Sequence, residues 1–223
     1  MGKQQASYKI FSFYKGNVNP RVPRYQKAVF RYFGQTVHQV VREDFDHGDF
    51  LNHICRTETG VDYLIFFDID CVPVSKAWIG WLLSDLQQPR TIAGAAQTAN
   101  HLRNGENLYV GPFFFGISTA YLKALNYPDM RLTDTMDAGQ NLTEVIQQEG
   151  GHVKYWWPTQ IEKKEWTLYH PVHNSFGPGT TYDNLVYHAF YSRFDLADRF
   201  ILKSKSLLKG SFYGYWWPWT KVP

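Results

Sequence analysis

The feature that most constrains the fold is a continuous apolar run between acidic residues at 62–70, with the sequence DYLIFFDID. Such a run is typical of a strand that is buried on both faces of a parallel sheet. Alternation of apolar and polar residues predicts earlier strands at 8–14 and 36–41, each followed by an amphipathic helix, at 22–33 and 45–59. The order of elements is therefore β-α-β-α-β, which favours an α/β fold with right-handed crossovers.

Strands and helices continue to alternate after residue 70. The predicted elements are a helix at 76–86, strands at 91–96 and 111–118, a helix that carries Tyr121, Leu122 and Leu125, a helix at 137–149 and a strand at 153–157. We expect one mainly parallel sheet flanked by helices, in a single domain that spans 1–223. Residues 158–190 contain few periodic apolar runs, so we expect a loop-rich segment there. A basic helix at 193–209 and an aromatic tail at 212–219 follow.

Composition excludes several classes of protein. The 23 Lys and Arg residues against 20 Asp and Glu give a net charge of +3, which indicates neither a nucleic-acid partner nor an anionic membrane. Cys55 and Cys71 are too few for a disulfide framework and form no Cys-x-x-Cys pair, so a reducing compartment is the simpler interpretation. The sequence has no signal-peptide pattern and no apolar run long enough to cross a membrane. We expect a cytoplasmic protein.

Two carboxylates, Asp68 and Asp70, stand at the end of the apolar run. Residues i and i+2 of a strand project to the same side, so both side chains could face one ion. The carboxyl end of a strand in an open α/β sheet is also where ligands bind. Two hard oxygen donors suit Mg²⁺ or Mn²⁺, and such an ion could bridge them to a diphosphate. The alternative is that two solvated acids simply end the strand, although close carboxylates repel each other unless a cation intervenes.

Three stretches of the sequence resemble the GT-A family of nucleotide-sugar glycosyltransferases, and the small size is similar to that of single-domain members encoded by bacteriophages. FFDID at 66–70, after GVDY at 60–63, is similar to the Asp-x-Asp region of that family. GPFFFGIS at 111–118 is similar to its glycine-rich strand on the acceptor side, and DTMDAG at 134–139 to its later acidic motif. The resemblance implies a nucleotide-binding half at 8–100, an acceptor and metal half at 101–190, and a C-terminal helix and tail at 191–223.

The resemblance implies transfer of a sugar from a nucleoside-diphosphate sugar, in the first place a UDP-sugar, to a glycan or another hydroxyl compound. It also implies a divalent ion, Mn²⁺ or Mg²⁺, held by Asp68, Asp70 and His188, because His188 is similar to a C-terminal histidine of the family. An imidazole in the ligand set favours Mn²⁺ over Mg²⁺. His170 and His173 remain competitors for this role because they lie in the same loop-rich segment.

The resemblance assigns roles to further positions. Asp134 or Asp137 would be the general base of an inverting reaction, although the usual Glu-Asp pair of the family is absent here. If the reaction retains configuration, these acids only position the acceptor. The positions implied for nucleotide contacts are Phe13, Tyr14 and Lys15 after the first strand, Asp44 after the second, Asn52 and His53 in the following helix, and Asp68.

Two other functions stay open. A sugar-1-phosphate nucleotidyltransferase typically has a Gly-rich basic loop near its first strand, whereas GNVNP at 16–20 has a single Gly. The second is a non-catalytic, metal-assisted carbohydrate-binding module. The tail at 212–219 has three interpretations: part of the core, a platform that stacks on a sugar, or a contact with a membrane surface or a second copy of the chain in a homo-oligomer.

Overall fold

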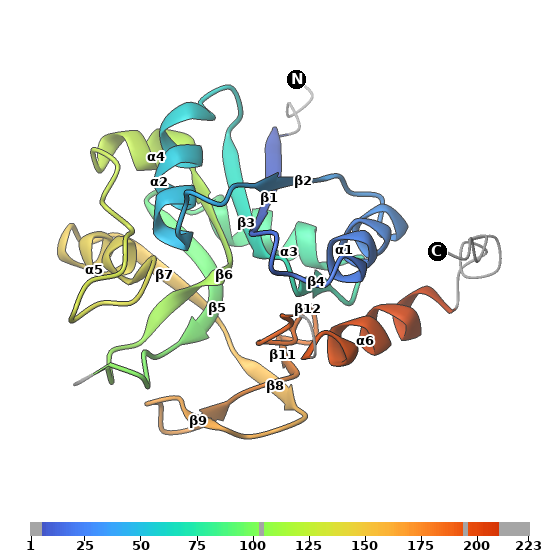
Figure 1. Ribbon diagram of the computed structural model, residues 1–223. Helices are drawn as coiled ribbons and strands as arrows, with labels where there is room; N and C mark the ends of the chain where they lie inside the picture. The colour runs from blue at the N-terminus through green and yellow to red at the C-terminus, as the bar shows by residue number, and fades with distance from the viewer. Residues whose placement is uncertain (1–5, 103–104, 194–195, 210–223) are drawn as a thin grey trace.

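A central six-stranded sheet organises the structure, a computed structural model that describes residues 6–102, 105–193 and 196–209 (Figure 1). In spatial order its strands are β2 (Val37–Val41), β1 (Tyr8–Tyr14), β3 (Tyr63–Asp68), β6 (Tyr109–Ser118), β5 (Thr91–Gln97) and β7 (His152–Trp156). β1 pairs in parallel with β2 and β3, and β5 pairs in parallel with β7. β6 runs antiparallel between β3 and β5. The expected α/β class with a mainly parallel sheet is confirmed.

Helices cover both faces of this sheet. The helices that contribute to the core on one face are α1 (Arg21–Tyr32), α3 (Trp78–Leu86) and α6 (Asp198–Leu208), and those on the other face are α2 (His47–Thr57), α4 (Thr119–Ala124) and α5 (Gln140–Gln148). Alternate residues of β3 divide between the two cores: Ile65 and Phe67 join the first, and Leu64 and Phe66 join the second. β3 is therefore buried on both faces, as its apolar run predicts.

A smaller sheet is formed mostly by residues of the segment that the sequence analysis expects to be loop-rich. Its strands, all paired antiparallel, are in spatial order β4 (Cys71–Pro73), β12 (Val186–His188), β11 (Thr180–Tyr182) and β8 (Pro158–Ile161), and a separate pair is formed by β9 (Trp166–Thr167) and β10 (Ser175–Phe176). The expectation of a loop-rich segment at 158–190 therefore misses the short strands β8 to β12. Strands of two to four residues contain too few alternating positions to show a period, and β12 pairs with a strand far away in sequence.

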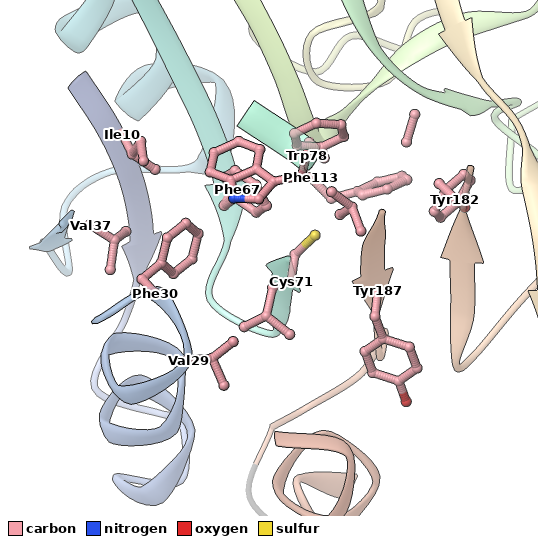
Figure 2. Close-up of a cluster of buried hydrophobic side chains, with 14 of the residues drawn as sticks. Ile10, Val29, Phe30, Val37, Phe67, Cys71, Trp78, Phe113, Tyr182 and Tyr187 are labelled. Atoms are coloured by element: carbon pink, nitrogen blue, oxygen red, sulfur yellow. The ribbon is translucent and has the colours of Figure 1, made fainter. Parts of the chain in front are cut away.

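One aromatic core joins the two sheets. Phe30 and Phe67 meet edge to face with ring centroids 4.9 Å apart, and Trp78 meets Phe67 in the same way at 5.3 Å. Figure 2 shows Cys71 of β4 and Tyr187 of β12 in the same cluster. Because densely packed aromatic side chains tolerate little displacement, this cluster fixes the smaller sheet against the edge of the larger one.

The helices α5 and α6 begin three and five residues later than the sequence analysis expects. Gly139 has a φ of 78°, a left-handed conformation outside a regular helix, so α5 begins at Gln140 and Asp137 precedes it. The basic helix α6 begins at Asp198 rather than at 193. The tail at 212–219 lies outside the described residues, so its three interpretations stay predictions. Within the ranges that the structure describes, no helix is long and apolar enough to cross a bilayer.

Candidate active site

The acidic turn after β3 forms the centre of the candidate site. Asp68 is the last residue of β3, and Ile69 and Asp70 form a turn before β4 begins at Cys71. The two carboxylates therefore do not lie on one strand, and the strand alternation expected to align them is not what brings them together. The chain reverses there to enter the smaller sheet, and the backbone N–H of Ala189, just after β12, donates to the Asp70 carbonyl over 3.0 Å.

His188 reaches this turn through strand pairing. In the antiparallel register of β4 and β12, His188 lies opposite Cys71. Its Nε2 is 3.0 Å from Oδ1 of Asp70 and 3.6 Å from Oδ2 of Asp68. One ligand atom from each of these three residues lies within 4.8 Å of the others. Two carboxylates and an imidazole nitrogen form a mixed donor set that fits a first-row divalent ion such as Mn²⁺.

The His188 ring is fixed by apolar packing. It stacks on Phe113 with ring centroids 4.3 Å apart and contacts Phe190 at 3.7 Å. Among the described residues Nδ1 has no hydrogen-bond partner, and the side chain is only 3% exposed. Aromatic contacts therefore set the orientation of this imidazole, where many metal-binding histidines use a hydrogen bond from their second nitrogen.

Asp68 lies between two imidazoles. His47 Nε2 is 3.3 Å from Oδ1 of Asp68, whereas His188 faces the other carboxylate oxygen, Oδ2. Burial raises the pKa of the Asp68 carboxyl, and the charges of Asp70 and Asp137 raise it further, against the opposing effect of the two histidines. This crowding of negative charge is what a bound cation would relieve.

Asp70 is held in its charged form. Burial is the largest single influence and acts to raise its pKa, but His188 and Ser192 together outweigh it and lower the pKa. His188 contributes both its charge and its hydrogen bond, and the Ser192 backbone N–H donates to Oδ2 over 3.2 Å. A buried carboxylate that stays charged beside a second acid is the arrangement that a divalent ion binds well.

His47 is a residue that the sequence analysis missed. It is the first residue of α2, whose start is fixed by a capping box between Asp46 and Asp49. Gly48 follows, and a side chain there would collide with the backbone of Arg131. The available signal was a histidine near the start of the helix predicted at 45–59, which follows the strand predicted at 36–41, but the sequence analysis selected His53 of that helix instead.

The end of β1 lies beside the acidic turn, because Phe13 pairs in register with Asp68. The Phe13 ring stacks on Phe50 of α2 at 5.0 Å, and Lys15 forms an ion pair with Asp46 at 2.9 Å. Tyr14 packs against the opposite core, so it faces away from Phe13. The structure thus brings Phe13 and Lys15, but not Tyr14, to the α2 side of this edge.

Three other residues predicted to contact a nucleotide lie along a surface hollow of about 570 Å³ beside α2: Asp44, Asn52 and His53. Hydrogen bonds from Arg42 lower the pKa of exposed Asp44 to about 2. Asn52 is largely buried, and both ends of its amide are used: it donates to Asp129 and accepts from the Met130 backbone N–H. His53 contacts Phe45, and the imidazoles beside the acidic turn are those of His47 and His188.

The two candidate bases have different surroundings. Asp137 is half-buried, accepts a hydrogen bond from the Tyr109 hydroxyl at 2.6 Å, and is close enough to raise the pKa of Asp68. Its Oδ1 accepts from the Ala138 backbone N–H at 2.8 Å. Asp134 is exposed in a bend. Of the two acids, Asp137 is therefore the one that a buried side chain supports and whose charge acts on the acidic turn.

His170 and His173 belong to a different cluster. Both rings pack on Trp157, with centroid distances of 4.3 and 4.8 Å. Nδ1 of His170 also accepts from the backbone N–H of His173. Among the described residues, the histidine whose ligand atom gathers with Asp68 and Asp70 is His188.

Comparisons with known proteins give a fold. No protein-family model matches the sequence, and no curated protein matches it either. A glycosyltransferase involved in glycosylation of the major capsid of PBCV-1 superposes with a TM-score of 0.51 at 12% identity, covering 87% of this chain and 99% of that one. A Drosophila β1,4-galactosyltransferase 7 mutant, crystallised with manganese, UDP-Gal and xylobiose, gives a TM-score of 0.47 at 13% identity, covering 84% and 73%.

A third similar structure, a glucose-1-phosphate thymidylyltransferase from Bacillus anthracis, gives a TM-score of 0.40 at 9% identity, covering 67% of this chain and 86% of that one. At such identities a structural likeness concerns the fold and not the activity. The order of strands, the acidic turn at the carboxyl edge of β3 and the PBCV-1 enzyme agree on that fold. The chain has the GT-A fold of nucleotide-sugar glycosyltransferases.

Proposed function

We propose that this protein is a metal-dependent glycosyltransferase that moves a hexosyl group from a UDP-sugar to a hydroxyl acceptor. The observation that carries the proposal is the convergence of Asp68, Asp70 and His188 at the carboxyl edge of β3. This edge is where open α/β sheets bind their ligands. The capsid glycosyltransferase that shares the fold supports the choice of reaction.

Asp68, Asp70 and His188 would hold the ion, with Mn²⁺ preferred because the donor set contains a nitrogen. When bound, such an ion supplies positive charge that stabilises the leaving diphosphate. Phe13, at the end of the strand next to Asp68, offers an aromatic edge for the nucleotide. Lys15, paired with exposed Asp46, offers a cation that can exchange this partner for a phosphate oxygen.

Asp137 would accept the proton of the acceptor hydroxyl if the reaction inverts configuration. Burial and the charge of Asp137 raise the pKa of the Tyr109 hydroxyl, so it stays protonated and keeps donating to Oδ2. A carboxylate held by fixed donors, here the Tyr109 hydroxyl and the Ala138 backbone N–H, presents its remaining lone pairs in a constant direction, which is what a general base needs. In the part of the chain that the structure describes, no buried side chain supports exposed Asp134 in this way, so Asp137 is the stronger candidate.

The cellular setting stays a prediction. Cys55 and Cys71 are both buried and unpaired, which agrees with the reducing compartment expected from the sequence. Burial raises the pKa of the Cys55 thiol to about 12, so this residue is not a reactive nucleophile.

The test is release of UDP from a panel of UDP-sugars, measured with Mn²⁺ and with excess EDTA. We expect UDP release with at least one donor in Mn²⁺ and none in EDTA. Undiminished turnover in EDTA would overturn the metal dependence. Release of pyrophosphate from UTP and a sugar 1-phosphate would identify a nucleotidyltransferase instead, and binding of donor or glycan without any turnover would identify a binding module.

A further inference from the structure

We propose that Gln26 is a positioning residue for the acidic turn, and that its side-chain amide holds Asp68 and Asp70 at the separation a divalent ion requires. This inference rests on the proposed metal-dependent function. Gln26 lies on α1, which contributes no carboxylate or imidazole to the site, and the sequence analysis gives it no role.

The Gln26 amide ties both ends of the turn with one nitrogen atom. Its Nε2 donates to the backbone carbonyl of Asp68 over 2.6 Å and to that of Cys71 over 3.1 Å. These two carbonyls bracket the Ile69 and Asp70 turn. The Gln26 side chain is fully buried, so water does not compete for these bonds.

A second glutamine fixes the orientation of the first. Gln39 of β2 donates from Nε2 to Oε1 of Gln26 over 2.8 Å and to the backbone carbonyl of Pro23 over 2.9 Å. If the Gln26 amide were flipped, its NH₂ group would face the NH₂ of Gln39 and its oxygen would face two carbonyl oxygens. Only one orientation satisfies every group, so donors point at the turn in a defined direction.

The residues around Gln26 are apolar, so a side-chain amide at this position would destabilise the fold unless it were hydrogen-bonded. Its neighbours along α1, Val22, Val29 and Phe30, are buried members of the apolar core. An unpaired amide at this depth would destabilise the fold, and removal of the amide would take this donor away from the Asp68 and Cys71 carbonyls. The other hydrogen bonds on the turn come from His188 of β12 and, just after it, from Ala189 and Ser192. Gln26 is thus the tether on the side of the central sheet.

Loss of the Gln26 hydrogen bonds should lower the metal affinity of the site more than it lowers the stability of the fold. With its backbone released from α1, the turn can move relative to His188, and the spacing of the three ligand atoms is no longer fixed. Removal of groups that orient metal ligands typically lowers metal affinity by about 10-fold to 100-fold. We expect a loss of that size in Gln26→Met, which keeps the length and volume of the side chain and removes both donors.

The experiment measures the affinity of Mn²⁺ in the presence of saturating UDP, by isothermal titration calorimetry, together with the thermal midpoint of each protein. The control is Thr119→Val, which removes a hydrogen bond from a side chain to the Val61 carbonyl just before the opposite end of β3. Gln26→Met should bind Mn²⁺ at least about 10-fold more weakly than wild type. Thr119→Val should lower the thermal midpoint and leave the Mn²⁺ affinity unchanged.

The possible failures are distinguishable. Wild type that binds no Mn²⁺ with UDP overturns the proposed function and this inference with it. Wild type that binds Mn²⁺, with an equal affinity in Gln26→Met, overturns the positioning role alone. An equal loss of affinity in Thr119→Val would also overturn it, because general destabilisation would then account for the effect.

Discussion

Different interactions hold the two parts of the candidate metal site, the acidic turn and His188, in place. The acidic turn is fixed by hydrogen bonds from Gln26 and Ser192, whereas His188 is fixed by aromatic contacts with Phe113 and Phe190. Hydrogen bonds specify distance and direction at individual atoms, and stacked rings specify the plane of a side chain through many weak contacts. The position of the two carboxylates should therefore depend on single hydrogen-bond donors, and the orientation of the His188 imidazole on the packing of the rings around it.

The largest effect should come from the carboxylate side. Asp70→Ala removes the charged carboxylate of the turn, and we expect Mn²⁺-dependent binding of UDP to fall below detection in titration calorimetry. Because Gln26 bonds to backbone carbonyls and not to this side chain, the turn keeps its tether and thermal unfolding should stay cooperative. Asp134→Ala, an exposed acid in a bend, is the matched control and should bind as wild type does.

A substitution of Asp137 tests whether proton transfer from the acceptor can be separated from donor binding at the metal site. Asp137→Asn keeps the shape of the side chain and removes the base, so transfer should fall by about 10² to 10⁴ with donor affinity little changed. Steady-state kinetics with varied donor separates these two quantities. Asp134→Asn should change transfer less. If both variants keep wild-type turnover, neither acid is the base, and a retaining mechanism gains support.

A substitution of His188 tests the part of the site that aromatic packing holds in place. His188→Ala should weaken Mn²⁺ binding by about 10-fold through loss of one ligand. It should also lower the free energy of unfolding by about 2 kcal/mol, because the missing ring leaves a cavity beside Phe113 and Phe190. Titration calorimetry and denaturant unfolding measure the two effects separately.

The matched controls for His188 are His170→Ala and His173→Ala, which remove imidazoles packed on Trp157. Both should leave Mn²⁺ affinity unchanged. Undiminished affinity in His188→Ala together with a loss in either control would show that a different histidine serves the metal.

The sequence by itself determined the order of the elements in and around the central sheet, and the position of the acids. The apolar run of β3 is long enough to specify a strand buried on both faces, and Asp68 and Asp70 follow it directly. That information is local, because alternation and burial leave their pattern within a few consecutive residues. The edge of the sheet where the site lies was therefore predictable from the sequence.

Only the tertiary structure decided which side chains meet the acids. Asp70 and His188 are 118 positions apart, and they meet because β12 pairs with β4, two strands of three residues each that leave no periodic pattern. The same limit applies to Asp137, which is distinguished from Asp134 by a hydrogen bond from buried Tyr109. His47 and Gln26 likewise act through atoms distant in sequence. Such contacts depend on the packing of helices and sheets against one another, and no stretch of sequence encodes that packing on its own.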